Sequence, residues 1–459
     1  PDMTSAVSGK TLPPSLWAVT APSLAAQPPL QGDATCDVAI IGAGFTGLRC
    51  ALGLAEAGTS VRVLDAREVG YGASGRSGGQ VNPILRKTVE AVRAELPPGI
   101  GDNLVQATLS SGTALFDDIR RYGIDCDAVE KGWLQVAHSG RMLTKLQALR
   151  DSWNAAGGTI RELDASATES WSGARGYVGG LFHATAGHVQ PLSLTRGYAK
   201  AALERGAVIH EATPVVALDR DPGGGWRLTT PSGRLSADRV VIATNGYTDA
   251  LWPGLKATII PFVSIQAATA PLTDEQQAQV LPRGTTFADT RRSIIYGRYD
   301  RDGRLCIGCI GSYPDAPAAL GAFRRLKSGT ERAFPALHGV RWDRKWGGYI
   351  AMTTDALPHL HEPAPGLTIG LGYNGRGVAM SAVMGRTLAA RILGMPDRDL
   401  PFAVTPPALV KVPEPSCCTN IPAWVKNPDS DRVSAPFPRW KMPPLPVNSR
   451  GCSSIGCEA

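Results

Sequence analysis

The chain has 459 residues, of which 43% are hydrophobic and 19% are charged, values typical of a globular protein with two or three domains. Its 47 Lys and Arg residues only slightly exceed its 40 Asp and Glu residues, which argues against a nucleic-acid-binding protein. The sequence has neither the ~18-residue apolar stretch of a membrane span nor a secretory signal, so we expect a soluble cytoplasmic protein.

The first predicted element is an N-terminal arm. Residues 1–35 are rich in Pro, Ala and Ser, which is typical of an extended segment. A βαβ unit follows, with a buried strand over 37–41, a glycine turn over 42–47, a helix over 48–57 and a second strand over 60–65. The strands of such a unit pair in parallel, so both of their faces are buried.

The rest of the chain mixes helices and strands. Apolar residues at helical spacing predict helices over 104–122, 142–156, 192–205 and 378–393. Apolar runs predict strands over 208–210, 239–244 and 367–371. Turn residues predict two hairpins, over 226–235 around Pro231-Ser232 and over 294–310 around Asp302-Gly303. These elements indicate an α/β fold combined with an antiparallel β-sheet.

Strand–turn–helix units occur at both ends of the chain, with a hairpin-rich region between them. We therefore expect a Rossmann-type dinucleotide-binding domain interleaved with a substrate domain built on an antiparallel sheet. The first domain is expected to comprise residues 36–95, 188–262 and 350–402, and the second residues 96–187 and 263–349. Residues 403–459 hold 11 of the 36 prolines and four of the nine cysteines, which predicts a poorly ordered tail.

The glycine turn reads Gly42-Ala43-Gly44-Phe45-Thr46-Gly47, a G-x-G-x-x-G motif. It follows a strand and opens a helix, so its glycines permit the close approach of a pyrophosphate to the helix N-terminus. Asp65 ends the next strand, where an acid can accept hydrogen bonds from a ribose and disfavours the 2′-phosphate of NADP. A glycine-rich turn without a ligand and an NAD-binding regulatory module remain alternatives at this point.

A second glycine-rich segment runs from Gly70 to Gln80 and reads GYGASGRSGGQ. Such a loop exposes many backbone N–H groups beside small side chains. It is suited to line a flat polar ring system or a further phosphate, and the alternative is a flexible surface loop.

These motifs resemble those of the FAD-dependent D-amino-acid oxidase-like superfamily, and the chain is most similar to its γ-glutamylputrescine oxidase-like amine oxidoreductases. The resemblance rests on GAGFTG, on the strand end Leu64-Asp65-Ala66 and on the loop that begins at Gly70. Four shorter segments agree: SLWAVTA from Ser15, TPV from Thr213, ATNG from Ala243 and GYNGRG from Gly372. The similarity covers roughly residues 12 to 407.

The resemblance implies FAD as the cofactor. It also implies non-covalent binding, since the 70–80 loop contains no Cys or His for attachment. The cofactor-binding residues implied in this way are Gly42, Gly44, Phe45, Thr46, Gly47, Asp65, Ala66, Ala73, Ser74, Arg76, Ser77, Gly78, Gly79, Gln80, Val215, Ala243, Thr244, Asn245, Gly246, Gly372, Tyr373, Asn374, Gly375, Arg376 and Gly377. The last three are expected at a helix N-terminus that faces the flavin, where N–H groups stabilise negative charge.

The chemistry implied is oxidation of an amine C–N bond to an imine. Such a site needs positioning and exclusion of water more than a strong acid or base. The candidate catalytic residues are Tyr296 and Arg298, which share one face of a predicted strand, together with Trp346 and Arg376. For each aromatic residue, a place in the hydrophobic core is the alternative.

One difference from the superfamily's sequence pattern bears on the class of substrate. Amino-acid oxidases commonly bind the substrate α-carboxylate with an Arg, and one branch carries this Arg where Gly375 stands here. An amine without an α-carboxylate is therefore favoured, with a γ-glutamyl-polyamine as one example. A D-amino-acid or N-methyl-amino-acid dehydrogenase or oxidase and a non-catalytic flavin-binding accessory protein remain alternatives. The electron acceptor is expected to be oxygen or another molecule.

No metal site is expected. Cys306 and Cys309 form a single C-x-x-C in an apolar run, which favours buried strand cysteines. His359 and His361 follow Pro358, which favours a loop.

Overall fold

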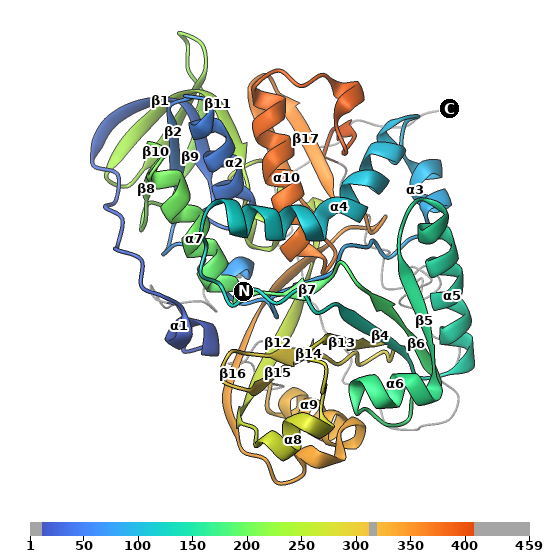
Figure 1. The fold of residues 1–459 in the computed structure, drawn as a ribbon. Coiled ribbons are helices and arrows are strands. Elements are labelled where there is room, and N and C mark those ends of the chain that lie inside the picture. The colour runs from blue at the N-terminus through green and yellow to red at the C-terminus, as the bar shows by residue number, and fades with distance from the viewer. Residues whose placement is uncertain (1–11, 312–318, 408–459) are drawn as a thin grey trace, which may run out of the picture. The chain divides into compact units, whose positions relative to one another are not determined.

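The computed structural model describes residues 12–311 and 319–407. Its nine-stranded sheet has the order β19-β17-β18-β11-β1-β2-β8, and β10 and β9 extend it from β11 (Figure 1). The strands are β1 (Gly32–Ile41), β2 (Val61–Leu64), β8 (Val208–His210), β9 (Ala217–Arg220), β10 (Trp226–Thr230), β11 (Gly233–Ile242), β17 (His359–Ala364), β18 (Leu367–Leu371) and β19 (Val404–Thr405). The five strands from β18 to β8 pair in parallel, as the βαβ unit requires.

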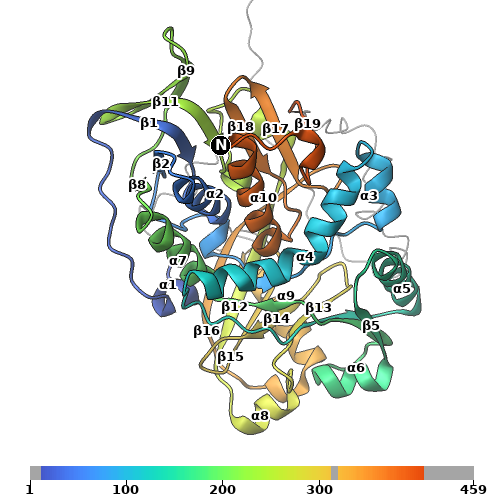
Figure 2. The ribbon, with the colours of Figure 1, turned by 45° about the horizontal axis from the view of Figure 1, so that its top comes forward.

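Three helices lie side by side over this sheet in both views (Figures 1 and 2): α2 (Phe45–Glu56), α7 (Pro191–Leu203) and α10 (Gly377–Ile392). Val38 and Ile40 of β1 belong to the hydrophobic core that these helices share, whereas Ala39 and Ile41 belong to the core of the opposite face. Successive side chains of a strand point to opposite faces, so this alternation buries both faces of β1, as predicted.

A second sheet has eight strands in the order β16-β12-β15-β14-β13-β4-β6-β5. They are β4 (Trp133–Ala137), β5 (Ile160–Asp164), β6 (Gly179–His183), β12 (Ile260–Pro271), β13 (Thr286–Asp289), β14 (Tyr296–Tyr299), β15 (Arg304–Ile310) and β16 (Trp342–Met352). All neighbours are antiparallel except β13 and β4. The predicted combination of a parallel sheet with an antiparallel one is therefore confirmed, while the domain boundaries stay a prediction.

The remaining elements connect and cover the sheets. They are α1 (Leu16–Thr20), α3 (Val89–Glu95), α4 (Ile100–Arg121), α5 (Gly140–Ala155), α6 (Ala165–Ser172), α8 (Asp274–Gln279), α9 (Ala319–Ala333) and the short two-stranded sheet of β3 (Gln80–Val81) and β7 (Gly187–His188). α4 is tied to α2 and α10 by a buried ion pair of Asp118 with Arg49 and Arg386, at 2.8 Å each.

The predicted extended arm is wrong in two places. Residues 16–20 form α1, because the Ser15 hydroxyl caps the helix by accepting from the Ala18 N–H at 3.1 Å and because Leu16 and Trp17 are buried. β1 already begins at Gly32, where it pairs with Gly233 of β11. The predicted strand over 239–244 belongs to the same long β11, so two predicted strands are one element.

Two further predictions about the C-terminal part change. The tail predicted over 403–459 contains β19, which pairs in parallel with β17, while residues 408–459 lie outside the described part. The loop expected around His359 is β17, paired with β18. The Asp302-Gly303 hairpin is confirmed, since β14 and β15 are antiparallel and Gly303 has a φ of 74°.

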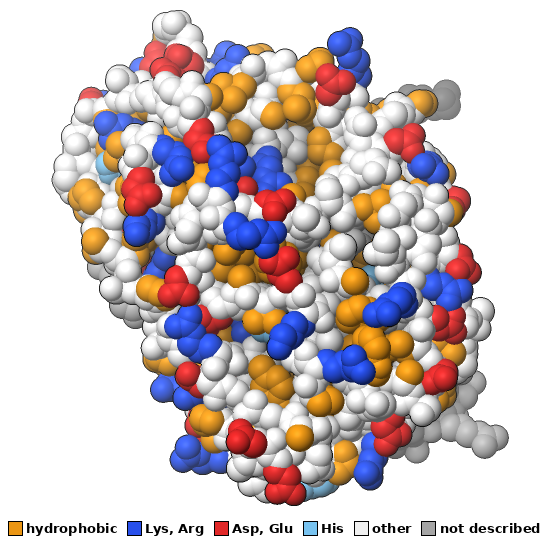
Figure 3. All heavy atoms as spheres, in the orientation of Figure 1, with side chains coloured by type: hydrophobic (Ala, Val, Ile, Leu, Met, Phe, Trp, Pro, Cys, Tyr) orange, Lys and Arg blue, Asp and Glu red, His pale blue; other side chains and the backbone are white. Residues whose placement is uncertain are grey.

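The surface carries mixed charges. Figure 3 shows blue and red side chains interspersed over the face seen in Figure 1, as the small net charge of +7 leads one to expect. Within residues 12–311 and 319–407, none of the helices is both long and apolar enough to cross a membrane.

Candidate active site

The glycine turn brings α2 directly against the end of β1. Gly42 has a φ of 110°, and a Cβ on it would lie 3.0 Å from the Ala243 carbonyl oxygen. A Cβ on Gly47 would lie 2.0 Å from the Gly42 oxygen, so only glycine lets the helix begin this close to the turn. The first turn of α2 thus presents its N–H groups at the carboxyl end of the parallel sheet.

Asp65 faces this turn from the end of β2. Its Oδ2 accepts from the Ala43 N–H and its Oδ1 from the Arg67 N–H, both at 2.8 Å. Burial, with a smaller contribution from the nearby Glu211 carboxylate, raises the pKa of Asp65 to about 6 although the two backbone N–H groups oppose the shift. The carboxylate is therefore held in one orientation beside the turn, where it can accept from a ribose. Val215 is half-buried and Ala66 is exposed.

The backbone carbonyls of the 70–80 loop accept hydrogen bonds from surrounding residues, and these bonds hold the loop in place. The Trp346 and Trp17 indole N–H groups donate to the oxygens of Arg76 and Ser77, each at 2.9 Å. Arg298 Nε donates to the Gly78 oxygen at 3.0 Å, and a backbone N–H donates to the Gly79 oxygen at 2.9 Å. Four successive carbonyls are thus engaged, so the loop is a fixed part of the site and the flexible-loop alternative fails.

Direct contacts join the predicted cofactor segments to one another. The Ser74 hydroxyl accepts from the Phe45 N–H at 2.9 Å, and the Thr46 and Tyr373 hydroxyls lie 2.6 Å apart. Asn245 Oδ1 accepts from the Gly372 N–H at 2.9 Å. The segments 42–47, 70–80, 243–246 and 372–377 therefore meet at the carboxyl ends of β1, β11 and β18. Gly44 permits the close approach of the 70–80 loop, since a Cβ on it would lie 2.9 Å from Ser74 Oγ. We call the four segments together the cradle of the candidate site. These residues fit a bound dinucleotide such as FAD.

Tyr296 lies where the second sheet meets the 70–80 loop. Its hydroxyl accepts from Gln266 Nε2 at 2.7 Å and contacts the Ser264 hydroxyl. Gly308 stands between Tyr296 and Gln266 in the sheet register, and a Cβ there would lie 2.6 Å from the Tyr296 ring. Gly308 thus allows the two side chains to meet. Burial raises the pKa of Tyr296, so the phenol is protonated at physiological pH.

Sequence patterns did not mark Gln266 or Ser264. Both lie in the long strand β12, where the alternation of polar and apolar residues indicates only which side chains lie on the same face of the sheet. Their importance follows from the cross-strand register with β15 and β14, which a single segment does not contain.

Two predicted catalytic residues have contacts that favour a positioning role. Arg298 is 1% exposed, and its guanidinium donates to three backbone oxygens, those of Gly78, Val189 and Tyr299. Trp346 is likewise 1% exposed and is bound to the loop through its N–H group. A guanidinium already bound to three carbonyls has few donors left for a substrate. Arg376 differs, because it occupies the N-cap position of α10 without a capping hydrogen bond from its side chain, and its guanidinium packs over the Trp133 ring.

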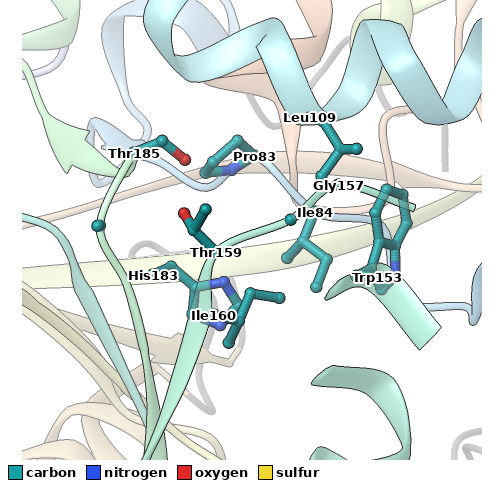
Figure 4. Close-up of a pocket in the computed structure, with 11 residues that line it drawn as sticks. Pro83, Ile84, Leu109, Trp153, Gly157, Thr159, Ile160, His183 and Thr185 are labelled. Atoms are coloured by element: carbon teal, nitrogen blue, oxygen red, sulfur yellow. The ribbon is translucent and has the colours of Figure 1, made fainter. Parts of the chain in front are cut away.

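A cavity of about 120 Å³ lies elsewhere, between α4, α5 and the end of β6 (Figure 4). Ile84, Leu109 and Trp153 supply much of its apolar wall, and the His183 ring also lines it. It shares no lining residue with the predicted cofactor set.

Comparisons with known proteins agree with this geometry. The model of the DAO family, described as FAD dependent oxidoreductase, matches residues 37–391. A probable oxidoreductase, OrdL, of Haemophilus influenzae is 33% identical over 81% of this chain and 86% of its own. The γ-glutamylputrescine oxidoreductase of Escherichia coli is 30% identical over 85% of this chain and 92% of its own. The crystal structure of glycine oxidase from Geobacillus kaustophilus shares the fold, with a TM-score of 0.68 and 24% identity over 81% of this chain and 98% of that one.

Proposed function

The chain belongs to the DAO family of FAD-dependent oxidoreductases, and from this premise we propose that it oxidises the C–N bond of a primary or secondary amine. The product is an imine, which water then hydrolyses. When bound, FAD supplies the acceptor for a hydride equivalent. The observation that carries the proposal is the contact between the immobilised 70–80 loop and the neutral polar pair of Tyr296 and Gln266.

The cofactor is assigned to the cradle described above. The first turn of α2 would receive the pyrophosphate and Asp65 the ribose hydroxyls. The 70–80 loop and the 372–377 turn would hold the flavin, without a covalent bond. This assignment is supported by the contacts that join the four segments and by the glycines that let these segments approach one another closely.

The residues of the second sheet bind and orient the amine. A protonated Tyr296 phenol can donate one hydrogen bond while it accepts from Gln266. The buried indoles of Trp17 and Trp346 close one side of the loop against water. Hydride transfer from a neutral amine needs this positioning and dryness, and it needs no strong base.

A γ-glutamyl-polyamine is the substrate type that the comparisons favour, because the E. coli relative carries γ-glutamylputrescine in its name. Gly375 supports an amine over an α-amino acid, since the carboxylate-binding Arg of one branch is missing there. Electrons pass to oxygen or to another acceptor. The location of the protein in the cell stays a prediction.

A panel of amines tests this function. Purified holoenzyme is mixed with each amine without air, and bleaching of the flavin absorbance is recorded; air is then admitted and peroxide is measured. Bleaching by an amine supports the proposal, and peroxide distinguishes an oxidase from a dehydrogenase. If D-amino acids bleach the flavin and amines do not, the amino-acid alternative replaces it. If nothing bleaches the flavin, the accessory-protein alternative stands.

A further inference from the structure

Two arginines that have no acidic partner among residues 12–311 and 319–407 stand together beside the 372–377 turn. Arg86 Nε donates to the Asn374 carbonyl oxygen at 3.1 Å, and its Nη2 lies 3.3 Å from where a Cβ on Gly375 would be. Arg376 Nη1 donates to the side-chain oxygen of Asn82 at 3.1 Å when that amide is oriented to accept. Gly375 therefore makes room for a guanidinium that comes from a different part of the chain.

Within the described ranges, Arg86 and Arg376 form no salt bridge, whereas Arg49, which is buried like Arg376, is paired with Asp118 at 2.8 Å. Arg376 is 9% exposed, and its buried Nε has no acceptor in the part of the chain that the structure describes. A buried charge without a partner is costly, and such a cost is typical of a site that an anion completes.

The two charges also act on each other. Burial and, to a smaller extent, the neighbouring Arg86 charge together lower the pKa of Arg376 to about 9. Burial among protein atoms lowers the pKa of Arg86 as well, although its side chain is exposed to solvent.

Arg376 stands over the same sheet face as Tyr296. Its guanidinium carbon lies 4.8 Å from the centre of the Trp133 ring. Trp133 and Gln135 share a face of β4, and Gln135 is aligned through Ala288 with Tyr296. Because β13 lies between β4 and β14, Gln135 and Tyr296 are two strand spacings apart, and Trp133 lies two residues along β4 from Gln135. Together these two offsets place the Trp133 and Tyr296 backbones about 12 Å apart. An extended chain of up to about ten bonds spans such a distance.

We propose that Arg86 and Arg376 form a binding site for a carboxylate that the amine substrate carries several bonds away from the oxidised C–N bond. This inference rests on the proposed amine oxidation and deepens it. It favours γ-glutamyl amines over simple diamines, and it accounts for a site that lacks an Arg at position 375 yet retains strong positive charge. Two guanidinium groups offer a carboxylate more donors than one, and charge-assisted hydrogen bonds are strong.

The test compares γ-glutamylputrescine with putrescine as substrates of the holoenzyme. We expect Arg86→Gln and Arg376→Gln each to lower the ratio of kcat/KM for γ-glutamylputrescine to kcat/KM for putrescine by about 10- to 100-fold. Arg239→Gln, at an exposed position of β11, should leave the ratio unchanged. An unchanged ratio in both site variants would overturn the proposal. So would a shifted flavin midpoint potential together with equal losses of kcat/KM for both substrates, because the arginines would then act on the flavin.

A binding measurement keeps the inference testable if no amine is oxidised. Glutarate should bind the holoenzyme in calorimetry and should bind at least 10-fold more weakly to both variants. Glutarate binding with no oxidation of any amine would mean that the carboxylate site is real and the proposed oxidation is wrong. Amine oxidation with an unchanged substrate ratio and no glutarate binding would mean that the proposed oxidation is correct and the carboxylate site is wrong.

Discussion

Trp17 and Trp346 donate their indole N–H groups to adjacent carbonyls of the 70–80 loop, Ser77 and Arg76, at 2.9 Å each. The two rings meet edge to face with their centres 5.4 Å apart. The helix α1 and the strand β16, which are far apart in the sequence, thus bind neighbouring peptide units of one loop. The geometry of the loop therefore depends on tertiary contacts as well as on its glycines.

Trp17→Phe should weaken FAD binding about 3- to 10-fold, because it removes one hydrogen bond to the loop and keeps most of the ring. The dissociation constant is measured by fluorescence as FAD is added back to the stripped protein. Trp342→Phe is a matched control, since the buried Trp342 Nε1 has no hydrogen-bond partner in the part of the chain described. Equal FAD affinity in Trp17→Phe and the wild type would show that this indole N–H does not position the loop.

Arg298→Lys should destabilise the protein by about 3 kcal/mol, since an ammonium cannot reach all three carbonyls that the planar guanidinium binds. Denaturant unfolding monitored by circular dichroism measures this loss. If Arg298 instead acts directly on the substrate, Arg298→Lys would keep its stability and lose kcat, which contradicts the positioning role.

FAD affinity should fall as the pH is lowered through about 6. Burial raises the pKa of Asp65 to about 6, so below this pH the group is protonated and loses acceptor capacity for ribose hydroxyls. Above this pH the carboxylate is charged and binds fully. Asp65→Asn should bind FAD about 10-fold more weakly at pH 8 and lose the dependence on pH around 6. A variant that retains the dependence would place the titrating group elsewhere.

Tyr296→Phe should lower kcat/KM for the amine about 10-fold while FAD binding is retained, because it removes the hydroxyl that pairs with Gln266. Tyr299→Phe is the matched control, since the Tyr299 hydroxyl donates to the Val280 oxygen on the other side of β14. Equal losses of kcat/KM in both variants would indicate a general effect on the strand.

Local sequence patterns predicted the elements whose signals are contained in one segment. The G-x-G-x-x-G turn, the strands on either side of α2 and the Asp302-Gly303 hairpin depend on neighbouring residues, and the structure confirms them. The α1 helix was missed because five residues carry too little periodicity, although Ser15 is a recognisable N-cap.

The rest of the site depends on contacts between distant segments. Arg86 reaches Gly375 across 289 positions of sequence, and Gln266 meets Tyr296 only through the register of β15. No pattern within one segment encodes such pairings. The missing Arg at position 375 was therefore visible in the sequence, whereas the guanidinium that stands beside Gly375 was not.

The central claim is that this chain uses FAD to oxidise an amine. Its most direct test is an anaerobic titration of the holoenzyme with γ-glutamylputrescine, in which the flavin absorbance is recorded after each addition. We predict complete bleaching at one equivalent of amine per FAD, with release of the aldehyde formed from the imine. A flavin that stays oxidised with excess γ-glutamylputrescine and with every other amine, in a protein that retains its FAD, would contradict the account.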